Sequence, residues 1–288
     1  MESIIKKADV LIESLPYIQR FNKKIVVIKY GGAVMENDEM RMSTLEDIVF
    51  MNFVGMKPVL VHGGGPFINE KMQEAGKKPE FIDGHRVTDE HTVQIVEETL
   101  SELNKKIAKE IRQLGALTES LGGRVDNLLK VKEQTAAQKK KFGFVGEIES
   151  VNPQAIKKTL KAGKIPVIYP AALGDKNEAY NVNADLAGAK IAVALKAKKF
   201  VLLTNTQGIM MNQDDEESLV STLRVKEVKD LIKRAVIKGG MLPKVKACVE
   251  ALKGGVDKTH IIDGRIPHSL LLEVFTDKGI GTEIIKVK

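Results

Sequence analysis

Short runs of consecutive apolar residues alternate along this chain with longer segments in which apolar residues recur every three or four positions. The clearest long segment is 91–114, whose valines, leucines and isoleucines repeat with the period of a helix. The short runs are rich in valine and isoleucine, which is typical of buried strands. They predict strands at 25–29, 58–62, 166–169, 200–204, 258–262 and 282–286.

Helical spacing fills most of the intervals between these runs. It predicts helices at 38–54, 66–75, 91–114, 153–162, 184–197, 224–234, 243–253 and 267–275. Strands that alternate with helices form parallel βαβ units, so we expect an open α/β sheet.

Three segments depart from this alternation. Residues 126–151 carry short apolar runs without a helical period, interrupted by Gly143 and Gly146, and predict a small set of antiparallel hairpins. Residues 172–179 are polar and contain glycine, which suggests a hinge between two lobes. Residues 212–218 are acidic and polar and suggest a solvated hairpin tip.

Glycine-bearing loops follow three of the predicted strands. The triplet Gly63–Gly65 precedes a predicted helix, and bare backbone N–H groups at a helix N-terminus favour an anion such as phosphate or carboxylate. The segments 29–32 and 204–208 also follow strands, and ligands of open α/β sheets lie beyond the carboxyl ends of strands. The alternative is a tight strand-to-helix turn, and the triplet fits neither the P-loop nor the dinucleotide-binding pattern.

Four charged residues are placed where they could serve such a site. Lys29 ends a predicted strand, and Arg86 offers a planar fork for a carboxylate. Both could instead be surface residues. Asp185 could hold ammonium groups or simply lie in the first turn of a helix capped by Asn183. Lys244 begins a helix, where a cation is disfavoured unless an anion lies nearby.

Composition narrows the partners. Of 288 residues, 43% are hydrophobic and 29% charged, and the net charge of +7 points weakly to anionic ligands. The lysines are scattered and aromatic residues are scarce, so we expect no nucleic-acid binding. No apolar run approaches the length of a membrane span, so we expect no membrane insertion. Cys248 is the single cysteine, which fits a cytoplasmic location, and the histidines lack metal-ligand spacing, so no protein metal site is expected.

Six motifs together resemble the amino acid kinase family from about residue 23 onward. They are KYGG at 29–32, VHGGGP at 61–66, GHRVTD at 84–89, NVNAD at 181–185, LTNTQGI at 203–209 and KGGMLPKV at 238–245. The pair GHRVTD and NVNAD is similar to the branch that acts on N-acetyl-L-glutamate. The resemblance implies an α/β three-layer sandwich around a mainly parallel eight-stranded sheet, with an acetylglutamate lobe (23–175) and an ATP lobe (176–288).

The resemblance also implies a reaction and the residues that carry it. The γ-phosphoryl group of MgATP would pass to the side-chain carboxylate of N-acetyl-L-glutamate, giving an acyl phosphate, the second step of arginine biosynthesis. Lys29 and Lys244 would stabilise the phosphoryl group, oriented by Asp185. The implied substrate-binding residues are Gly32, Gly64, Gly65, Arg86, Asn181 and Asn183. The implied nucleotide-binding residues are Gly31, Thr204, Gln207, Gly208, Ile209, Gly240 and Met241. Phosphoryl transfer depends on positioning and charge, so the lack of an evident catalytic histidine agrees with this reading.

Two segments depart from the family pattern. The loop that usually reads close to LTDVDGV is LTNTQGI here, with amides in place of both acids. Residues 122–127 read GGRVDN, where the family tends to carry a lysine-aspartate-glycine run. The first departure removes two negative charges from the side of the site where ATP would bind.

Residues 1–22 form an extension with apolar residues at helical spacing, namely Ile4, Ile5, Ala8, Leu11, Leu15 and Ile18. Such a helix is marginal alone and should pack on its own or another subunit. The resemblance to arginine-inhibited members implies a hexamer built as a trimer of dimers through this helix. It also implies an arginine-binding site at Tyr17, Lys199, Glu273, Gly279 and Gly281. Two alternatives remain: a kinase for a related acylated amino dicarboxylate such as acetylaminoadipate, or a catalytically weak arginine-binding regulator.

Overall fold

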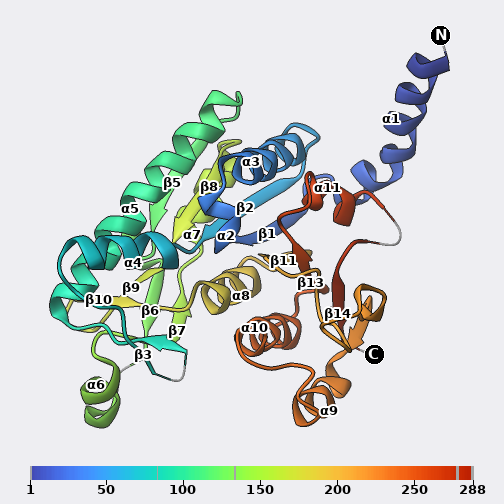
Figure 1. The fold of residues 1–288 in the computed structure, drawn as a ribbon. Helices are drawn as coiled ribbons and strands as arrows, with labels where there is room; N and C mark the ends of the chain where they lie inside the picture. Colours follow the sequence, from blue (N-terminus) through green and yellow to red (C-terminus); the bar gives the residue numbers. More distant parts are fainter. Residues whose placement is uncertain (1, 83, 133, 277–278, 287–288) are drawn as a thin grey trace.

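All six predicted strands lie in one eight-stranded sheet. The computed structural model describes residues 2–82, 84–132, 134–276 and 279–286, and its sheet lies between two layers of helices (Figure 1). In spatial order the strands are β12 (Thr222–Arg224), β14 (Thr282–Ile285), β13 (Lys258–Asp263), β11 (Lys199–Thr204), β1 (Ile25–Tyr30), β2 (Lys57–His62), β8 (Ile165–Tyr169) and β5 (Thr118–Gly122). Only the β13–β14 pair in this sheet is antiparallel, which confirms the expected mainly parallel sandwich.

Alternation along β1 assigns its side chains to the two layers. Val26 and Ile28 pack into the apolar core formed with α3 (Asp38–Phe53), α5 (Glu90–Gln113) and α11 (Ser269–Val274). Val27 packs on the other face, in the core formed with α7 (Gln154–Lys161), α8 (Ala184–Ala194) and α10 (Met241–Lys253). Because successive side chains of a strand point to opposite faces, Lys29 shares the face of Val27 and projects toward α8.

A four-stranded sheet covers one end of the molecule. Its order is β10 (Ala179–Asn181), β9 (Ala171–Leu173), β6 (Leu129–Val131) and β7 (Ile148–Val151), and a two-stranded ribbon, β3 (Phe81–Ile82) and β4 (His85–Arg86), accompanies it. The antiparallel β6–β7 pair confirms the hairpin predicted in 126–151. The prediction missed α6 (Ala136–Phe142) between them, although Thr135 and Gln138 form the capping box that announces a helix. The segment 172–179, predicted as a hinge between lobes, forms the β9–β10 hairpin.

Two further predicted segments are present in the structure, and one strand was missed. The edge strand β5 was missed because its sequence TESLG has a weak apolar pattern. The helix predicted at 224–234 is shorter, a 3₁₀ turn followed by α9 (Val228–Lys233). The segment 212–218 is the predicted hairpin tip, closed by a bridge between Met210 and Leu219.

The N-terminal extension is a helix, α1 (Glu2–Phe21), that projects from one corner of the molecule (Figure 1). Its far part leaves large apolar side chains exposed, at Ile5, Val10, Leu11, Ile12 and Leu15. Its near end is anchored, because Phe21 is buried and the ring of Tyr17 meets that of Phe275 edge-on. Within the described residues, no helix is both long and apolar enough to cross a bilayer.

Candidate functional site

Three charged side chains from distant parts of the chain meet at the carboxyl edge of the sheet. Lys29 arrives from the end of β1, Asp185 from the first turn of α8, and Lys244 from the first turn of α10. The Lys29 Nζ lies 2.8 Å from one carboxylate oxygen of Asp185, and the Lys244 Nζ lies 3.0 Å from the other. We call these three residues the triad. Asp185 is the anion that the position of Lys244 required.

The charges of the triad are fixed. Burial alone would raise the pKa of Asp185, but the two adjacent ammonium groups outweigh it and lower that pKa to about 2. Asp185 is therefore ionised at neutral pH. One negative and two positive charges leave a net charge of +1, which favours an anion beside the lysines.

Local structure explains how α8 reaches β1 closely enough. Asn183 caps α8, and its side-chain oxygen accepts from the N–H groups of Asp185 and Leu186. Gly188, one turn further, lies against the strands. A β-carbon there would stand 2.9 Å from the ring of Phe200 and 3.5 Å from the Lys29 Cβ. A side chain at Gly188 would push the helix and its carboxylate away from Lys29.

The glycine triplet lies at the start of α4 (Gly65–Glu74), and first-turn N–H groups have no partner within their helix. A β-carbon on Gly64 would approach the Leu100 Cδ2 to 2.8 Å, whereas one on Gly65 would meet no protein atom within 4 Å. Gly64 is thus required for packing, and Gly65 borders open space. Gly32 also has no protein atom within 4 Å of a built β-carbon, and its φ of +72° favours glycine.

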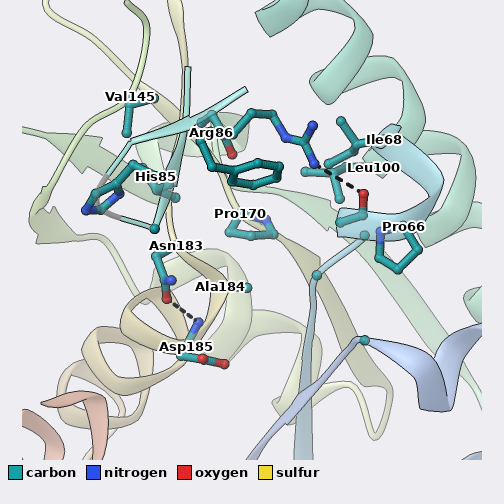
Figure 2. Close-up of a pocket in the computed structure, with 18 of the residues that line it drawn as sticks. Pro66, Ile68, His85, Arg86, Leu100, Val145, Pro170, Asn183, Ala184 and Asp185 are labelled. Carbon is teal, nitrogen blue, oxygen red and sulfur yellow. Dashed lines mark hydrogen bonds between the residues drawn. The ribbon is translucent and has the colours of Figure 1, made fainter. Parts of the chain in front are cut away.

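Arg86 lies on the side of the pocket opposite Asp185 (Figure 2). Its guanidinium donates to the Gly65 carbonyl oxygen at 3.2 Å and to the Asn69 Oδ1 at 2.6 Å, and it stacks on the ring of Phe81 at 4.8 Å. Burial lowers the pKa of Arg86. One further N–H donates to the sulfur of Met72. Three of its five N–H groups thus have a partner among the described residues, and the other two are available to a ligand carboxylate.

These groups line one cavity of about 270 Å³, which we call the central pocket. It gathers the predicted residues Lys29, Gly32, Gly64, Gly65, Arg86, Asn181, Asn183 and Asp185. Sequence reasoning missed its apolar wall, formed by Ile68, Phe81, Leu100, Val145 and Pro170. Those residues carry no chemistry of their own, so no motif could have indicated them. A pocket with cations at opposite sides and apolar walls suits a small dianion with an aliphatic body.

A second cavity of about 370 Å³ lies beyond the ends of β11 and β13. This β11 pocket contains the predicted Gln207, Gly208, Ile209 and Met241. Met241 and Lys244 are three residues apart on α10, so one helix face joins this pocket to the triad.

Three predicted nucleotide-binding residues, Thr204, Gly240 and Gly31, are not among the described residues that line the β11 pocket. Thr204 is buried and braces the loop through hydrogen bonds between its hydroxyl and Thr206. Gly240 precedes α10, and Gly31 lies under the ammonium of Lys29, where a β-carbon would stand 3.0 Å from the Nζ.

The loop that lines the β11 pocket carries Asn205 and Gln207, which are amides and add no negative charge to the pocket. Among its described lining residues the ionisable ones are both basic, Lys238 and Arg265. Arg265 is oriented by Asp263, which accepts hydrogen bonds from the Nε and one Nη of the guanidinium and from the Arg265 backbone N–H. Because Asp263 offsets the charge of Arg265, Lys238 gives this pocket its positive charge, which suits a polyphosphate, and neither basic residue was predicted from the sequence.

A third cavity, of about 140 Å³, lies at the opposite, amino edge of the sheet beside α1. This α1 pocket brings together all five residues predicted there: Tyr17, Lys199, Glu273, Gly279 and Gly281. Glu273 lies 2.6 Å from the Nδ1 of His260, and the ammonium of Lys199 lies over the ring of Phe21. Burial lowers the pKa of His260 and of Lys199, so His260 is neutral at pH 7.

In the part of the chain that the structure describes, no cluster of three or more histidine, cysteine or acidic side chains could hold a metal ion. The single thiol, Cys248, is buried, and burial raises its pKa to about 12.

Comparison with known proteins identifies relatives over almost the full length of the chain. The model of the amino acid kinase family matches residues 24–263. An acetylglutamate kinase from Syntrophomonas wolfei is 49% identical over 98% of this chain and 98% of its own. An acetylglutamate kinase from Heliobacterium modesticaldum is 48% identical over 99% of this chain and 100% of its own.

A solved structure matches as well. N-acetylglutamate synthase from Neisseria gonorrhoeae, in complex with coenzyme A and N-acetyl-glutamate, aligns with a TM-score of 0.86 and 26% identity, over 98% of this chain. The same synthase with coenzyme A and L-arginine aligns with a TM-score of 0.81 and 25% identity, over 96% of this chain. The matches cover 64% and 65% of the synthase, so this chain spans less than two thirds of its length.

Proposed function

The chain belongs to the amino acid kinase family, and we propose that it transfers the γ-phosphoryl group of MgATP to the side-chain carboxylate of N-acetyl-L-glutamate. The product is N-acetyl-L-glutamyl 5-phosphate, the second intermediate of arginine biosynthesis. The acetylglutamate kinases that match along almost the whole chain support this assignment. The observation that carries it is the triad at the edge of the central pocket, opposite Arg86.

The reaction needs charge stabilisation more than proton transfer. A side-chain carboxylate is ionised at neutral pH and attacks the γ-phosphorus directly. The bond from that phosphorus to the β–γ bridging oxygen breaks, and ADP leaves with the electron pair. Lys29 and Lys244 stabilise the charge on the phosphoryl oxygens, and Asp185 fixes both ammonium groups before the substrates arrive.

The two substrates occupy neighbouring pockets in this scheme. Arg86 binds the α-carboxylate of acetylglutamate, and Asn181 and Asn183 border the rest of that substrate in the central pocket. ATP occupies the β11 pocket, where Lys238 and Arg265 face its phosphates. Magnesium enters as part of the MgATP substrate. Residues 23–175 supply the acetylglutamate lobe and residues 176–288 the ATP lobe.

Trapping the acyl phosphate with hydroxylamine tests the assignment. With MgATP, we expect acetylglutamate to give a hydroxamate, with kcat/KM exceeding that of acetylaminoadipate by about tenfold or more, the usual discrimination of one methylene. Equal or better use of acetylaminoadipate would assign the longer substrate. Failure with both would indicate a regulator without catalysis, a role that the intact triad argues against.

Arginine fits the α1 pocket as an inhibitor. Glu273 can pair with a guanidinium, because its contact at 2.6 Å is with a neutral imidazole, and Lys199 can bind the α-carboxylate. The synthase that matches this chain has been solved with L-arginine. We therefore propose feedback inhibition of this kinase, in the cytoplasm, by the end product of its pathway.

Assembly through α1 would connect this inhibition to the oligomer. The exposed apolar side chains of α1 need a covering surface, and we propose that α1 helices of neighbouring dimers cover one another in a hexamer. Tyr17, Arg20 and Phe21 belong to both α1 and the α1 pocket. Removing residues 1–20 should leave an active dimer that arginine inhibits poorly. A truncated protein that sedimented as a hexamer would contradict the assembly.

A further inference from the structure

The imidazole of His62, the last residue of β2, contacts the first residue of the glycine triplet. It is completely buried, and neither it nor its partner Asn104 on α5 belongs to the described lining of the central pocket. The His62 Nδ1 lies 2.8 Å from the Gly63 carbonyl oxygen, and its Nε2 lies 3.0 Å from the Asn104 amide nitrogen. A buried histidine with two polar partners beside a reacting centre calls for an explanation.

The partners of the ring determine its tautomer. The Asn104 amide nitrogen can only donate, and its other hydrogen goes to the Val167 carbonyl oxygen at 2.9 Å. The His62 Nε2 must therefore accept, so the single proton of the neutral ring resides on Nδ1 and is donated to Gly63. Burial lowers the pKa of His62 to about 4, with a smaller contribution from the charge of Lys29, so the ring is neutral at pH 7.

Because a peptide is planar, the hydrogen bond between His62 and the Gly63 carbonyl also fixes the direction of the Gly64 N–H group. In a planar trans peptide the C=O of one residue and the N–H of the next point in opposite directions. Holding the Gly63 carbonyl toward His62 therefore directs the Gly64 N–H away from the ring. The next peptide is held by the helix itself, since the Gly64 carbonyl accepts from the Ile68 N–H at 2.9 Å. The Gly63–Gly64 peptide, flanked by two glycines, depends on His62 for its orientation.

We propose that His62 and Asn104 are a positioning pair that fixes the Gly63–Gly64 peptide so that the Gly64 N–H donates to the phosphoryl group in transfer. This inference rests on the proposed function. His62 is a positioning residue, because it acts through the backbone and touches neither substrate.

The tautomer can be observed without catalysis. In the full-length protein labelled with ¹⁵N-histidine, the signals of His62 are identified by their loss in His62→Asn. We expect a protonated Nδ1 and an unprotonated Nε2 from pH 6 to 8. A proton on Nε2, or a doubly protonated ring at pH 7, would overturn the proposal.

Kinetics then test the positioning role. Leucine at position 62 cannot donate, whereas asparagine can still reach Gly63 with its amide. We expect His62→Leu to lower kcat by about tenfold or more while KM for acetylglutamate changes little, as for loss of a transition-state donor. His62→Asn should recover a large part of kcat. The control is His91→Leu, an exposed position at the start of α5. Equal losses in His62→Leu and His62→Asn, or a wild-type kcat in His62→Leu, would refute the pair.

If thermal unfolding shows that His62→Leu does not fold, the variant Asn104→Leu provides a separate test. Asn104→Leu removes the donor to Nε2, so the Nε2-protonated tautomer should increase and kcat should fall. An unchanged tautomer with unchanged kcat would refute the role of Asn104. Failure of the proposed function is distinguishable, because the wild-type protein would then give no hydroxamate from acetylglutamate.

Discussion

The two edges of the central sheet each bury a lysine and a carboxylate, but the carboxylates differ in the groups that contact them. At the carboxyl edge, Asp185 contacts two lysines directly. At the amino edge, the closest charged or titratable contact of Glu273 is the neutral imidazole of His260. The first acid is saturated by fixed cations and serves to hold them. Glu273 retains a negative charge that can pair with a cationic group of a ligand.

Sheet geometry accounts for this difference. The carboxyl edge carries the starts of α4, α8 and α10, whose N-termini favour anions, and the glycines there leave room for them. The amino edge lacks that bias, and its pocket mixes acidic and basic side chains from strands, α1 and α11. One edge therefore suits a reacting phosphoryl group, and the other suits a zwitterionic effector.

The largest effect should come from breaking the triad. We expect Lys29→Ala to lower kcat by about 10²–10³-fold, because it removes a cation from the transferring phosphoryl group and leaves Asp185 with one partner. The matched control is Lys24→Ala, an exposed position just before β1. Steady-state hydroxamate kinetics measure both, and a Lys29→Ala enzyme with undiminished kcat would remove the triad from the mechanism.

A stability measurement tests the neutral histidine of the carboxyl edge. The pKa of His62 falls from 6.5 in the unfolded chain to about 4 in the folded protein. As the pH drops from 7 to 4.5 the unfolded chain therefore gains a proton that the folded one lacks, and stability is lost. The wild-type protein should lose about 2 kcal/mol more unfolding free energy over this interval than His62→Asn. Urea titrations measure the unfolding free energy of both proteins. If it changes equally with pH in the wild type and in His62→Asn, His62 is not buried in the neutral form.

Removing the negative charge of Glu273 tests whether arginine binds at the amino edge. Glu273→Gln keeps an acceptor for the Ile280 N–H but loses the charge that pairs with a guanidinium. We expect the arginine concentration for half-inhibition to rise by about tenfold or more, equivalent to about 1.4 kcal/mol. Asp230→Asn, on exposed α9, is the control. Unaltered inhibition in Glu273→Gln would place the effector elsewhere.

The smallest effect on stability should come from Gly65→Ala. The new methyl group meets no protein atom within 4 Å, so the unfolding free energy should stay within about 0.5 kcal/mol of wild type. KM for acetylglutamate should nevertheless rise, since the methyl group occupies space at the substrate. A variant that binds substrate normally would show that the open space at Gly65 is outside the site.

The periodic pattern predicted the central sheet and most of its helices because those elements bury regular apolar faces. It missed β5, an edge strand with a weak pattern, and α6, a short helix without an apolar face. The motifs predicted the triad, since its residues lie at strand ends and helix starts where chemistry concentrates.

Other parts of the site were beyond the reach of sequence reasoning. His62 and Asn104 are 42 positions apart, and their bond depends on how α5 packs against the sheet. Lys238 and Arg265 enter the β11 pocket only through the folding of two separate loops. No local sequence pattern predicts that these side chains lie close together.

An isotope experiment tests the central claim most directly. Acetylglutamate labelled with ¹⁸O in its side-chain carboxylate is turned over with MgATP, and the acyl phosphate is trapped with hydroxylamine, which attacks the carbonyl carbon. If a carboxylate oxygen attacks the γ-phosphorus beside the triad, each hydroxamate formed releases one phosphate that carries one ¹⁸O. Phosphate without the label, or no hydroxamate from the wild-type protein, would contradict the account.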